Sequence, residues 1–567
     1  MPLRFLAAAG PQEDLAEISR GVAETSSSLV PVLHRPGLAV WVSPQTPWLA
    51  SDDGSAVAIG TLFESERGVR LQRLPSPLPS PGCFTRRAWG CYLLVVEAPD
   101  GHWVLRDPSG GVTCYHRRHR SLSLYASDLA ILNLACSGPE EPDQGYLRQW
   151  LTYPQLRAAP TGIVGVREVL PGEALVARGA ELTASAAWTP WDHARPDRAI
   201  ASFEDAAAHV REAVLHAVPR LAADWNDVVV QLSGGLDSSI ICAALAAADC
   251  PFRAVTFATF APDGDERIHA RAVADHCGVE LAVLAEDTQP MDFATVPSLA
   301  LRPPPNALMR ALHRILANHF AVTEAGLAID GTGGDNVFCS LSNASPALDA
   351  LARQGPRAGL AAIQDLARVH GTTAWAASRA AWRRHRRPRE RWPADLSFLA
   401  PDAIAEMPAH FWLDAPSDAA RGTYEHVRSI VGIRHFLRDP APGETPALHP
   451  LLSQPVLEAC LRVPSWLWIR DGRDRAVARA AFGDLLPRAI LMRRSKGALQ
   501  SMFVSGYMAG RAVLEGLLLE GRLAQAEMID REAVHAYLQR SSQPGDFGYI
   551  RLLELASAET WLRSFDG

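Results

Sequence analysis

Residues 228–239, VVVQLSGGLDSS, contain the side chains that are best suited to chemistry. A Ser-Gly-Gly triplet at 233–235 follows a short run of apolar residues that is rich in β-branched side chains. It precedes a helical pattern that starts at Leu236. A strand, a glycine turn and a helix N-terminus together favour anions, because exposed N–H groups and the helix dipole point at the same place. Asp237 could hold a magnesium ion beside phosphate oxygens. The stretch therefore predicts a phosphate-binding loop, which is not of the Walker type because GxxxxGK[ST] is missing.

The pattern around this loop predicts the sheet that must position it. Residues 253–260 and 280–285 are typical of further strands, and a helix is expected over 267–277, ending at Gly278. Another short apolar strand leads into a glycine-rich turn that carries Asp335. Strands that alternate with helices indicate a parallel, doubly wound sheet, whose ligand lies at the carboxyl ends of the strands.

The segment SGGLDSS resembles the pyrophosphate-binding loop of the ATP pyrophosphatases, a group that includes asparagine synthetases, β-lactam synthetases and lasso-peptide cyclases. Those enzymes cleave ATP between its α and β phosphates and activate a carboxylate as its adenylate. The alternative is an ordinary strand–turn–helix of an α/β domain. The resemblance implies ATP and Mg²⁺ as cofactors. The ATP- or pyrophosphate-binding residues that it implies are Leu232, Ser233, Gly234, Gly235, Asp237, Ser238, Ser239, Thr256 and Gly331.

Residues 326–338, GLAIDGTGGDNVF, resemble the SGxGxDxxF segment of asparagine synthetases. The aspartate of that segment binds magnesium together with the loop aspartate, so the resemblance makes Asp237 and Asp335 the predicted metal ligands. Thr332 stands where asparagine synthetases have glutamate and β-lactam synthetases have tyrosine. That departure weakens assignment to either of these two groups.

Lys496 and Glu425 are the predicted catalytic residues. Residues 493–497, RRSKG, resemble the lysine segment near the end of the family core. A lysine there can hold the departing phosphates and stabilise charge on the acyl-adenylate and on the tetrahedral species that follows. Glu425, on a predicted helix, is a candidate base that has no aligned family residue. The segment at 449–455, HPLLSQP, resembles the form found in lasso-peptide cyclases.

The N-terminal third reads as short strands and turns, with a hairpin signal at Asp100-Gly101. Residues 106–115 and 162–175 resemble parts of the class II glutamine amidotransferase domain, an Ntn-hydrolase-like α+β sandwich. A working glutaminase of that class needs a cysteine at position 2, but this chain has Pro2 there, and its first cysteine is Cys83. We therefore expect a domain without its nucleophile, which acts as a scaffold or positions the substrate.

Composition limits the classes of function. The chain has 567 residues, of which 48% are hydrophobic and 21% charged, so two or three soluble globular domains are expected. Its net charge of −7 gives no basic field for nucleic acid, and no apolar run suggests a membrane span or a signal peptide. Nine scattered cysteines fit reduced thiols, so a cytoplasmic location is expected and a zinc site is not.

These observations predict two domains. Residues 1–195 form a degenerate glutamine amidotransferase-like domain. Residues 196–567 form an asparagine-synthetase-like, ATP-dependent cyclase domain, an α/β fold with an adenine-nucleotide-alpha-hydrolase-like parallel sheet and added helices.

The best fit is a lasso-peptide isopeptide-forming cyclase. The resemblance implies an enzyme that adenylates an Asp or Glu side chain of a core peptide and couples it to the peptide's N-terminal amine, releasing AMP and pyrophosphate. The resemblance implies two partners, a precursor peptide and a leader peptidase or leader-binding protein. Three alternatives stay open: a β-lactam synthetase, an ammonia-dependent asparagine synthetase, and a non-catalytic ATP- or peptide-binding assembly partner.

Overall fold

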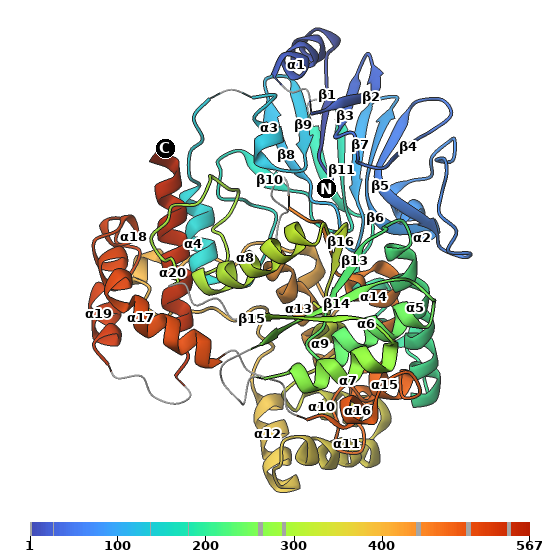
Figure 1. Cartoon of the computed structure of the whole chain (residues 1–567), viewed down its shortest axis with the longest axis vertical. Coiled ribbons are helices and arrows are strands. Elements are labelled where there is room, and N and C mark those ends of the chain that lie inside the picture. The colour runs from blue at the N-terminus through green and yellow to red at the C-terminus, as the bar shows by residue number, and fades with distance from the viewer. Residues whose placement is uncertain are drawn as a thin grey trace.

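The structure, a computed structural model, contains two antiparallel sheets and one parallel sheet, with helices around them (Figure 1). It describes residues 3–25, 28–136, 138–179, 181–258, 265–285, 291–437, 444–494, 500–540 and 546–566. Every helix in these ranges is too short or too polar to cross a bilayer. All nine cysteines are free thiols.

The two antiparallel sheets belong to the N-terminal third and pack face to face. The first has the order β10-β8-β9-β1-β3-β2 and the second β12-β11-β7-β6-β5-β4. Strands of the first sheet are β1 (Phe5–Ala9), β2 (Val30–Arg35), β3 (Leu38–Val42), β8 (Tyr115–His119), β9 (Leu122–Ala126) and β10 (Val166–Glu168). Strands of the second are β4 (Trp48–Ala50), β5 (Ala56–Glu64), β6 (Ala88–Ala98), β7 (Gly101–Arg106), β11 (Glu173–Arg178) and β12 (Glu181–Ala186).

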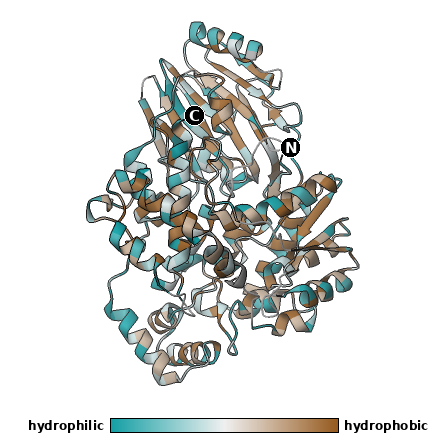
Figure 2. Cartoon of the chain, turned by 60° about the vertical axis from the view of Figure 1, so that its left-hand side comes forward, coloured by the Kyte–Doolittle hydropathy of each residue, from teal (hydrophilic) through white to brown (hydrophobic). Residues whose placement is uncertain are grey.

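The interior of this sandwich is made by alternate residues of its strands. Val40 of β3, Ile59 of β5 and Val95 of β6 belong to one buried apolar cluster between the sheets. The outer faces are covered by α1 (Gln12–Thr25) and α3 (Leu129–Leu132) on the first sheet and by α2 (Pro81–Arg87) on the second. The expected hairpin at Asp100-Gly101 joins β6 to β7. Figure 2 shows how the apolar residues gather on the strands.

The parallel sheet has the order β15-β14-β13-β16-β17, and every neighbouring pair in it is parallel, as the sequence predicted. Its strands are β13 (Val228–Gln231), β14 (Arg253–Ala258), β15 (Leu281–Ala285), β16 (Leu327–Ile329) and β17 (Ala447–Leu448). Helices α5 (Phe203–Ala222), α6 (Leu236–Ala246) and α7 (Arg267–Cys277) cover one face, and α8 (Ala307–Val322) covers the other. Both faces are therefore buried, which explains why the strands are continuously apolar.

The remaining helices extend this region and also contact the N-terminal third. They are α9 (Gly334–Val337), α10 (Ser345–Gln354), α11 (Pro356–Val369), α12 (Ala374–Arg386), α13 (Arg421–Ile433), α14 (Gln454–Leu461), α15 (Ala476–Ala481), α16 (Arg488–Met492), α17 (Gln500–Leu519), α18 (Arg522–Gln525), α19 (Arg531–Leu538) and α20 (Gly548–Arg563). Helix α4 (Gln144–Thr152) buries Leu147 and Leu151 against α17 and α20. One apolar core thus joins residues from both ends of the chain.

A buried ionic cluster around Glu168 also connects the two regions. Arg106 donates to Glu168 at 2.7 Å, and Arg157 and Arg302 approach the same carboxylate at 2.8 and 2.7 Å. Burial alone would raise the pKa of Glu168, but the three guanidinium groups hold it well below its ordinary value. Because Arg302 follows the parallel strands β13 to β15 in the chain and β10 carries Glu168, the Arg302–Glu168 pair joins the sandwich to the parallel-sheet region.

Candidate functional site

The loop between β13 and α6 presents backbone N–H groups at the carboxyl end of the parallel sheet. Gly235 is the N-cap of α6 and has no side chain, so the first turn of the helix has no side-chain cap. Serine hydroxyls hold the loop in shape. Ser239 donates to the Gly235 carbonyl at 2.7 Å, and the Ser233 and Ser238 hydroxyls lie 3.2 Å apart. Such a preorganised helix start is suited to a phosphate group.

Two glycines allow this loop to pack closely. Gly234 has φ +68°, and a Cβ there would lie 2.6 Å from the backbone nitrogen of Ala270. A Cβ on Gly331, which follows β16, would lie 2.8 Å from the backbone nitrogen of Ser238. Both glycines are therefore required for their backbone positions, and Gly331 brings the turn after β16 against the start of α6.

Asp237 and Asp335, which the sequence analysis predicted to be metal ligands, lie together at this point. Nη1 of Arg475 donates to Asp335 at 2.6 Å and approaches both carboxylate oxygens of Asp237 at 3.1 Å. Asp237 is 8% exposed and lies in the first turn of α6, while Asp335 is in the first turn of α9. Two hard carboxylates beside this helix start would suit a magnesium ion, which needs few protein ligands when phosphate oxygens complete its shell.

Arg475 was not identified by the sequence analysis. It precedes α15 in a left-handed conformation with φ 49°, and Asp474 contacts both Arg475 Nε at 3.0 Å and Arg479 at 3.1 Å. The nearby carboxylates keep the pKa of Arg475 above its ordinary value, although burial opposes them. The sequence signal was only a charged run, RDGRDR, in an otherwise apolar region, which a solvent-exposed turn would also produce.

Lys496 and the residues around it, 495–499, lie outside the described residues. The segment that leads to them reaches the loop, because Arg493 donates to the Gly234 carbonyl at 3.0 Å and to Glu266 at 2.8 Å. Thr256 of β14 and Leu232, after β13, are both buried in the sheet region next to the loop. Backbone contact joins these two strands, since Leu232 donates to Val255 at 2.8 Å.

Glu425 lies on α13 among arginines. Its carboxylate accepts from Arg384 of α12 and lies 3.8 Å from Arg421, and the side chain is almost fully buried. Arg384 belongs to a basic stretch, RRHRR at 383–387, and it points inward to Glu425. A carboxylate that pairs with two guanidinium groups is suited to holding helices together. Its role as a base stays a prediction.

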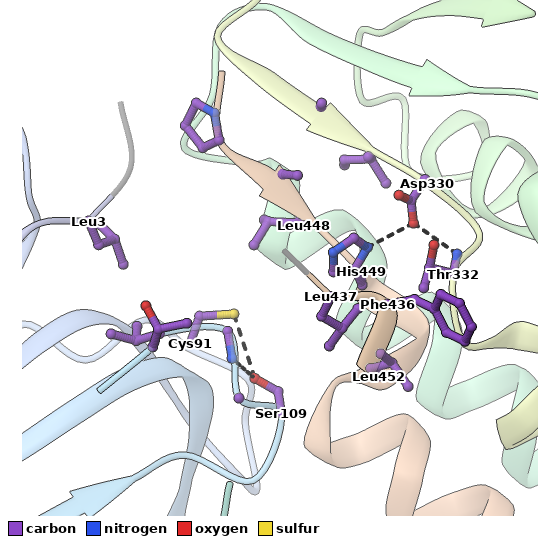
Figure 3. A pocket seen from close by; sticks show the side chains of 18 of the residues that line it. Leu3, Cys91, Ser109, Asp330, Thr332, Phe436, Leu437, Leu448, His449 and Leu452 are labelled. Carbon is purple, nitrogen blue, oxygen red and sulfur yellow. Dashed lines mark hydrogen bonds and ion pairs between the residues drawn. The ribbon is translucent and has the colours of Figure 1, made fainter. Parts of the chain in front are cut away.

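A cavity of about 450 Å³ lies between the sandwich and the carboxyl ends of the parallel strands (Figure 3). Leu3, Cys91 and Ser109 line the sandwich side, and Asp330, Thr332 and His449 line the opposite side. Burial, with a smaller effect of Asp107, raises the pKa of Cys91 to about 12, so its thiol stays protonated at neutral pH. Much of the remaining wall is apolar: Leu312, Leu316, Phe320, Leu437, Leu448 and Leu452.

Comparison with known proteins gives one family match and weak structural matches. The model of the family described as "Asparagine synthase" matches residues 209–563. Two solved structures are similar to this chain at 11% sequence identity, and each match covers 56% of this chain. They are the glutamine phosphoribosylpyrophosphate amidotransferase of B. subtilis complexed with ADP and GMP (89% of that chain, TM-score 0.21) and a structure described as the allosteric regulatory enzyme of purine biosynthesis (83%, TM-score 0.20). A search of curated proteins found no match.

Proposed function

Because the chain belongs to the asparagine synthase family, we propose that it is an AMP-forming, ATP-dependent amide ligase that closes a macrolactam in a peptide. An Asp or Glu side chain of the peptide attacks the α-phosphorus of ATP, which gives an acyl-adenylate and pyrophosphate. The peptide's N-terminal amine then attacks the acyl carbon, and AMP leaves. Family membership supports ATP-dependent amide formation, and the sequence resemblance to lasso-peptide cyclases supports the peptide substrate.

The observation that carries this proposal is the meeting of Asp237 and Asp335 beside the uncapped start of α6. The N–H groups of the loop would bind the β- and γ-phosphates, and the two carboxylates would hold Mg²⁺, which neutralises phosphate charge. The chain's own contribution is to place the carboxylate of the peptide substrate in line with the α-phosphorus of ATP and to exclude water from the adenylate.

The composition of the chain supports a specific role for Lys496. Among the 55 lysine and arginine residues, Lys496 is the only lysine. An ammonium is a compact point charge, whereas a guanidinium is a planar fork, so the two cations are not interchangeable at a phosphate. We assign Lys496 to the leaving pyrophosphate and to the charge that develops on the acyl group.

The cavity supports a bulky amine substrate over ammonia. Its volume of about 450 Å³ is larger than ammonia requires. Its leucine-rich wall suits the apolar side chains of a peptide segment. Thr332, on the same wall, supplies neither a carboxylate nor a phenol. These features favour the macrolactam reaction over asparagine or β-lactam synthesis.

The organisation of the chain belongs to the same proposal. Residues 1–195 would be an amidotransferase-like sandwich that serves as one wall of the peptide site, and residues 196–567 would carry the chemistry. A precursor peptide and a leader peptidase or leader-binding protein would be its partners. The two face-to-face antiparallel sheets and the parallel sheet support this division.

The test measures pyrophosphate release from Mg-ATP together with the mass of the product. Three acceptors are compared: linear peptides with an N-terminal Gly and an internal Asp or Glu, aspartate with ammonia, and small β-amino acids. Peptide-dependent release with loss of one water from the peptide is the expected result. Pyrophosphate release with aspartate or a β-amino acid alone would contradict the macrolactam assignment. The absence of pyrophosphate release with all three acceptors would contradict the ligase assignment.

The single lysine gives a second, independent test. An amine-reactive acylating reagent has only Lys496 and the α-amine as targets, and peptide mass spectrometry separates the two. We expect Mg-ATP to slow acylation of Lys496 while the α-amine reacts at an unchanged rate. Equal rates at Lys496 with and without Mg-ATP would contradict its place at the phosphates.

A further inference from the structure

Asp330 and His449 form a hydrogen-bonded pair at the edge of the cavity (Figure 3). Asp330 follows the last residue of β16, and His449 follows the last residue of β17. The two strands are parallel neighbours in which Ile329 is opposite Leu448, so the next residue of each strand also lies side by side. The distance between His449 Nδ1 and Asp330 Oδ1 is 2.8 Å.

The carboxylate determines how the imidazole is oriented. Asp330 Oδ1 also accepts the backbone N–H of Thr332 at 2.8 Å, which holds the carboxylate in place. Burial alone would raise the pKa of Asp330, but the hydrogen bond and charge of His449 bring it below its ordinary value. An ionised Asp330 requires a proton on Nδ1 of His449, so the basic lone pair of the neutral ring is on Nε2.

The pair is adjacent to the phosphate-binding loop. Gly331 follows Asp330 directly, and it is the residue whose Cβ would lie 2.8 Å from the Ser238 nitrogen. Thr332 is the neighbouring polar side chain on this wall, but an alcohol is not a base at neutral pH. An imidazole whose second ring nitrogen keeps its lone pair can accept a proton, so His449 is the group here that is suited to proton transfer.

We propose that His449, oriented by Asp330, is the general base that takes the proton of the acceptor amine. The substrate class is a primary amine with apolar neighbours, which enters through the leucine-lined cavity. This inference rests on the proposed ligase function and adds the group that activates its nucleophile. His449 is the catalytic residue, and Asp330 is a positioning residue.

The nitrogen lone pair of the neutral amine forms a C–N bond with the acyl carbon of the adenylate, and the carbonyl π electrons move to oxygen. The N–H proton passes to His449 Nε2. When the carbonyl reforms, the bond from carbon to the phosphate oxygen breaks and AMP leaves with that electron pair. The imidazolium then returns its proton to water, while Asp330 stays ionised and stabilises it.

The experiment separates the two half-reactions in the full-length protein. ATP–pyrophosphate exchange measures adenylation, and product mass measures coupling to whichever amine the wild-type protein uses. For His449→Gln, we expect exchange within about twofold of wild type and coupling lowered by about 100-fold or more. His276→Gln, at the exposed end of α7, is the matched control and should leave both rates unchanged. An equal loss of exchange and coupling in His449→Gln would overturn the assignment.

Chemical rescue distinguishes a base from a structural residue. Imidazole added to His449→Ala should restore coupling in proportion to its concentration, and it should not act on the wild type. No rescue with a correctly folded variant would overturn the proposal. His313 and Glu444 also line the cavity, so His313→Gln and Glu444→Gln are compared. If His313→Gln or Glu444→Gln loses as much coupling as His449→Gln, the base would be assigned to that residue instead of His449.

A measurement that does not depend on substrate tests the pair itself. Nitrogen-15 spectra of labelled histidine, with the His449→Gln spectrum subtracted, should show the Nδ1–H tautomer above neutral pH, and Asp330→Asn should change that signal. The Nε2–H tautomer would overturn the inference even if the protein is an active ligase. Failure of the ligase function would instead appear as wild-type protein that exchanges no pyrophosphate with any acceptor.

Discussion

Asp237 and Asp335 share one guanidinium nitrogen, although 98 positions of the sequence separate them. Nη1 of Arg475 lies 2.6 Å from a carboxylate oxygen of Asp335 and 3.1 Å from both carboxylate oxygens of Asp237. Three segments of the chain, α6, α9 and the residue before α15, therefore converge on one charged centre at the carboxyl edge of the parallel sheet.

This convergence predicts that each aspartate is required for adenylation. Asp237→Asn and Asp335→Asn keep the size of the side chain but remove a charge, and we expect each to lower ATP–pyrophosphate exchange by about 100- to 1,000-fold. Asp265→Asn, which removes an exposed partner of Arg267, should change exchange by less than about twofold. Circular dichroism checks that the variants are folded. ATP–pyrophosphate exchange at the wild-type rate in either variant would show that the substituted aspartate is not required for adenylation.

Glu425 is expected to support the fold rather than the chemistry. Glu425→Gln leaves Arg384 and Arg421 beside an uncharged amide, and breaking such a buried pair lowers the free energy of unfolding by about 3 kcal/mol. Urea unfolding measures this change, with Glu515→Gln at the exposed pair with His535 as the control. The exchange and coupling rates per folded molecule should be unchanged. A selective loss of coupling at full stability would instead support Glu425 as a base.

Glu168 is expected to be the main electrostatic link between the sandwich and the parallel-sheet region. Glu168→Gln leaves Arg106, Arg157 and Arg302 without their shared carboxylate, and we expect the free energy of unfolding to fall by about 3–5 kcal/mol. Urea unfolding measures the loss, and faster limited proteolysis should accompany it. Glu181→Gln, on the exposed strand β12, is the control. An unchanged unfolding midpoint would show that the cluster contributes nothing net.

The stability of the protein is expected to fall in mild acid. Burial lowers the pKa of His116 and His410 to about 3 and that of His426 to about 4. Each ring binds a proton in the unfolded chain near pH 6.5 but stays neutral when folded. Its contribution to stability is therefore complete above pH 6.5, and it is lost at up to about 1.4 kcal/mol per pH unit as the pH falls toward the folded pKa.

Urea unfolding at pH 7.5, 6.5 and 5.5 measures this loss. His426→Gln can still donate to the Val337 carbonyl, which His426 contacts at 2.9 Å, so this variant should show a shallower decline with falling pH. A free energy of unfolding that is constant from pH 7.5 to 5.5 would contradict the prediction.

The local features were predictable because short-range patterns determine them. The apolar run before Ser233 forms β13, the helix at 267–277 ends at Gly278 as expected, and the strands pair in parallel. The loop and Asp237 were predicted because glycines and a helix start mark an anion site within a few residues. Asp335 was predicted from the resemblance of residues 326–338 to the SGxGxDxxF segment.

The contacts that complete the site depend on segments far apart in the chain, and no local pattern reports them. Arg475 reaches Asp237 across 238 positions, and His449 reaches Asp330 across 119. The sequence predicted Glu425 as a base on a helix, but only packing shows that Arg384 contacts it. The sequence by itself therefore determined the parallel sheet and the loop, and it predicted the two aspartates as a pair. Only the tertiary structure decided which charges meet there, because burial and ion pairing follow from how the elements pack.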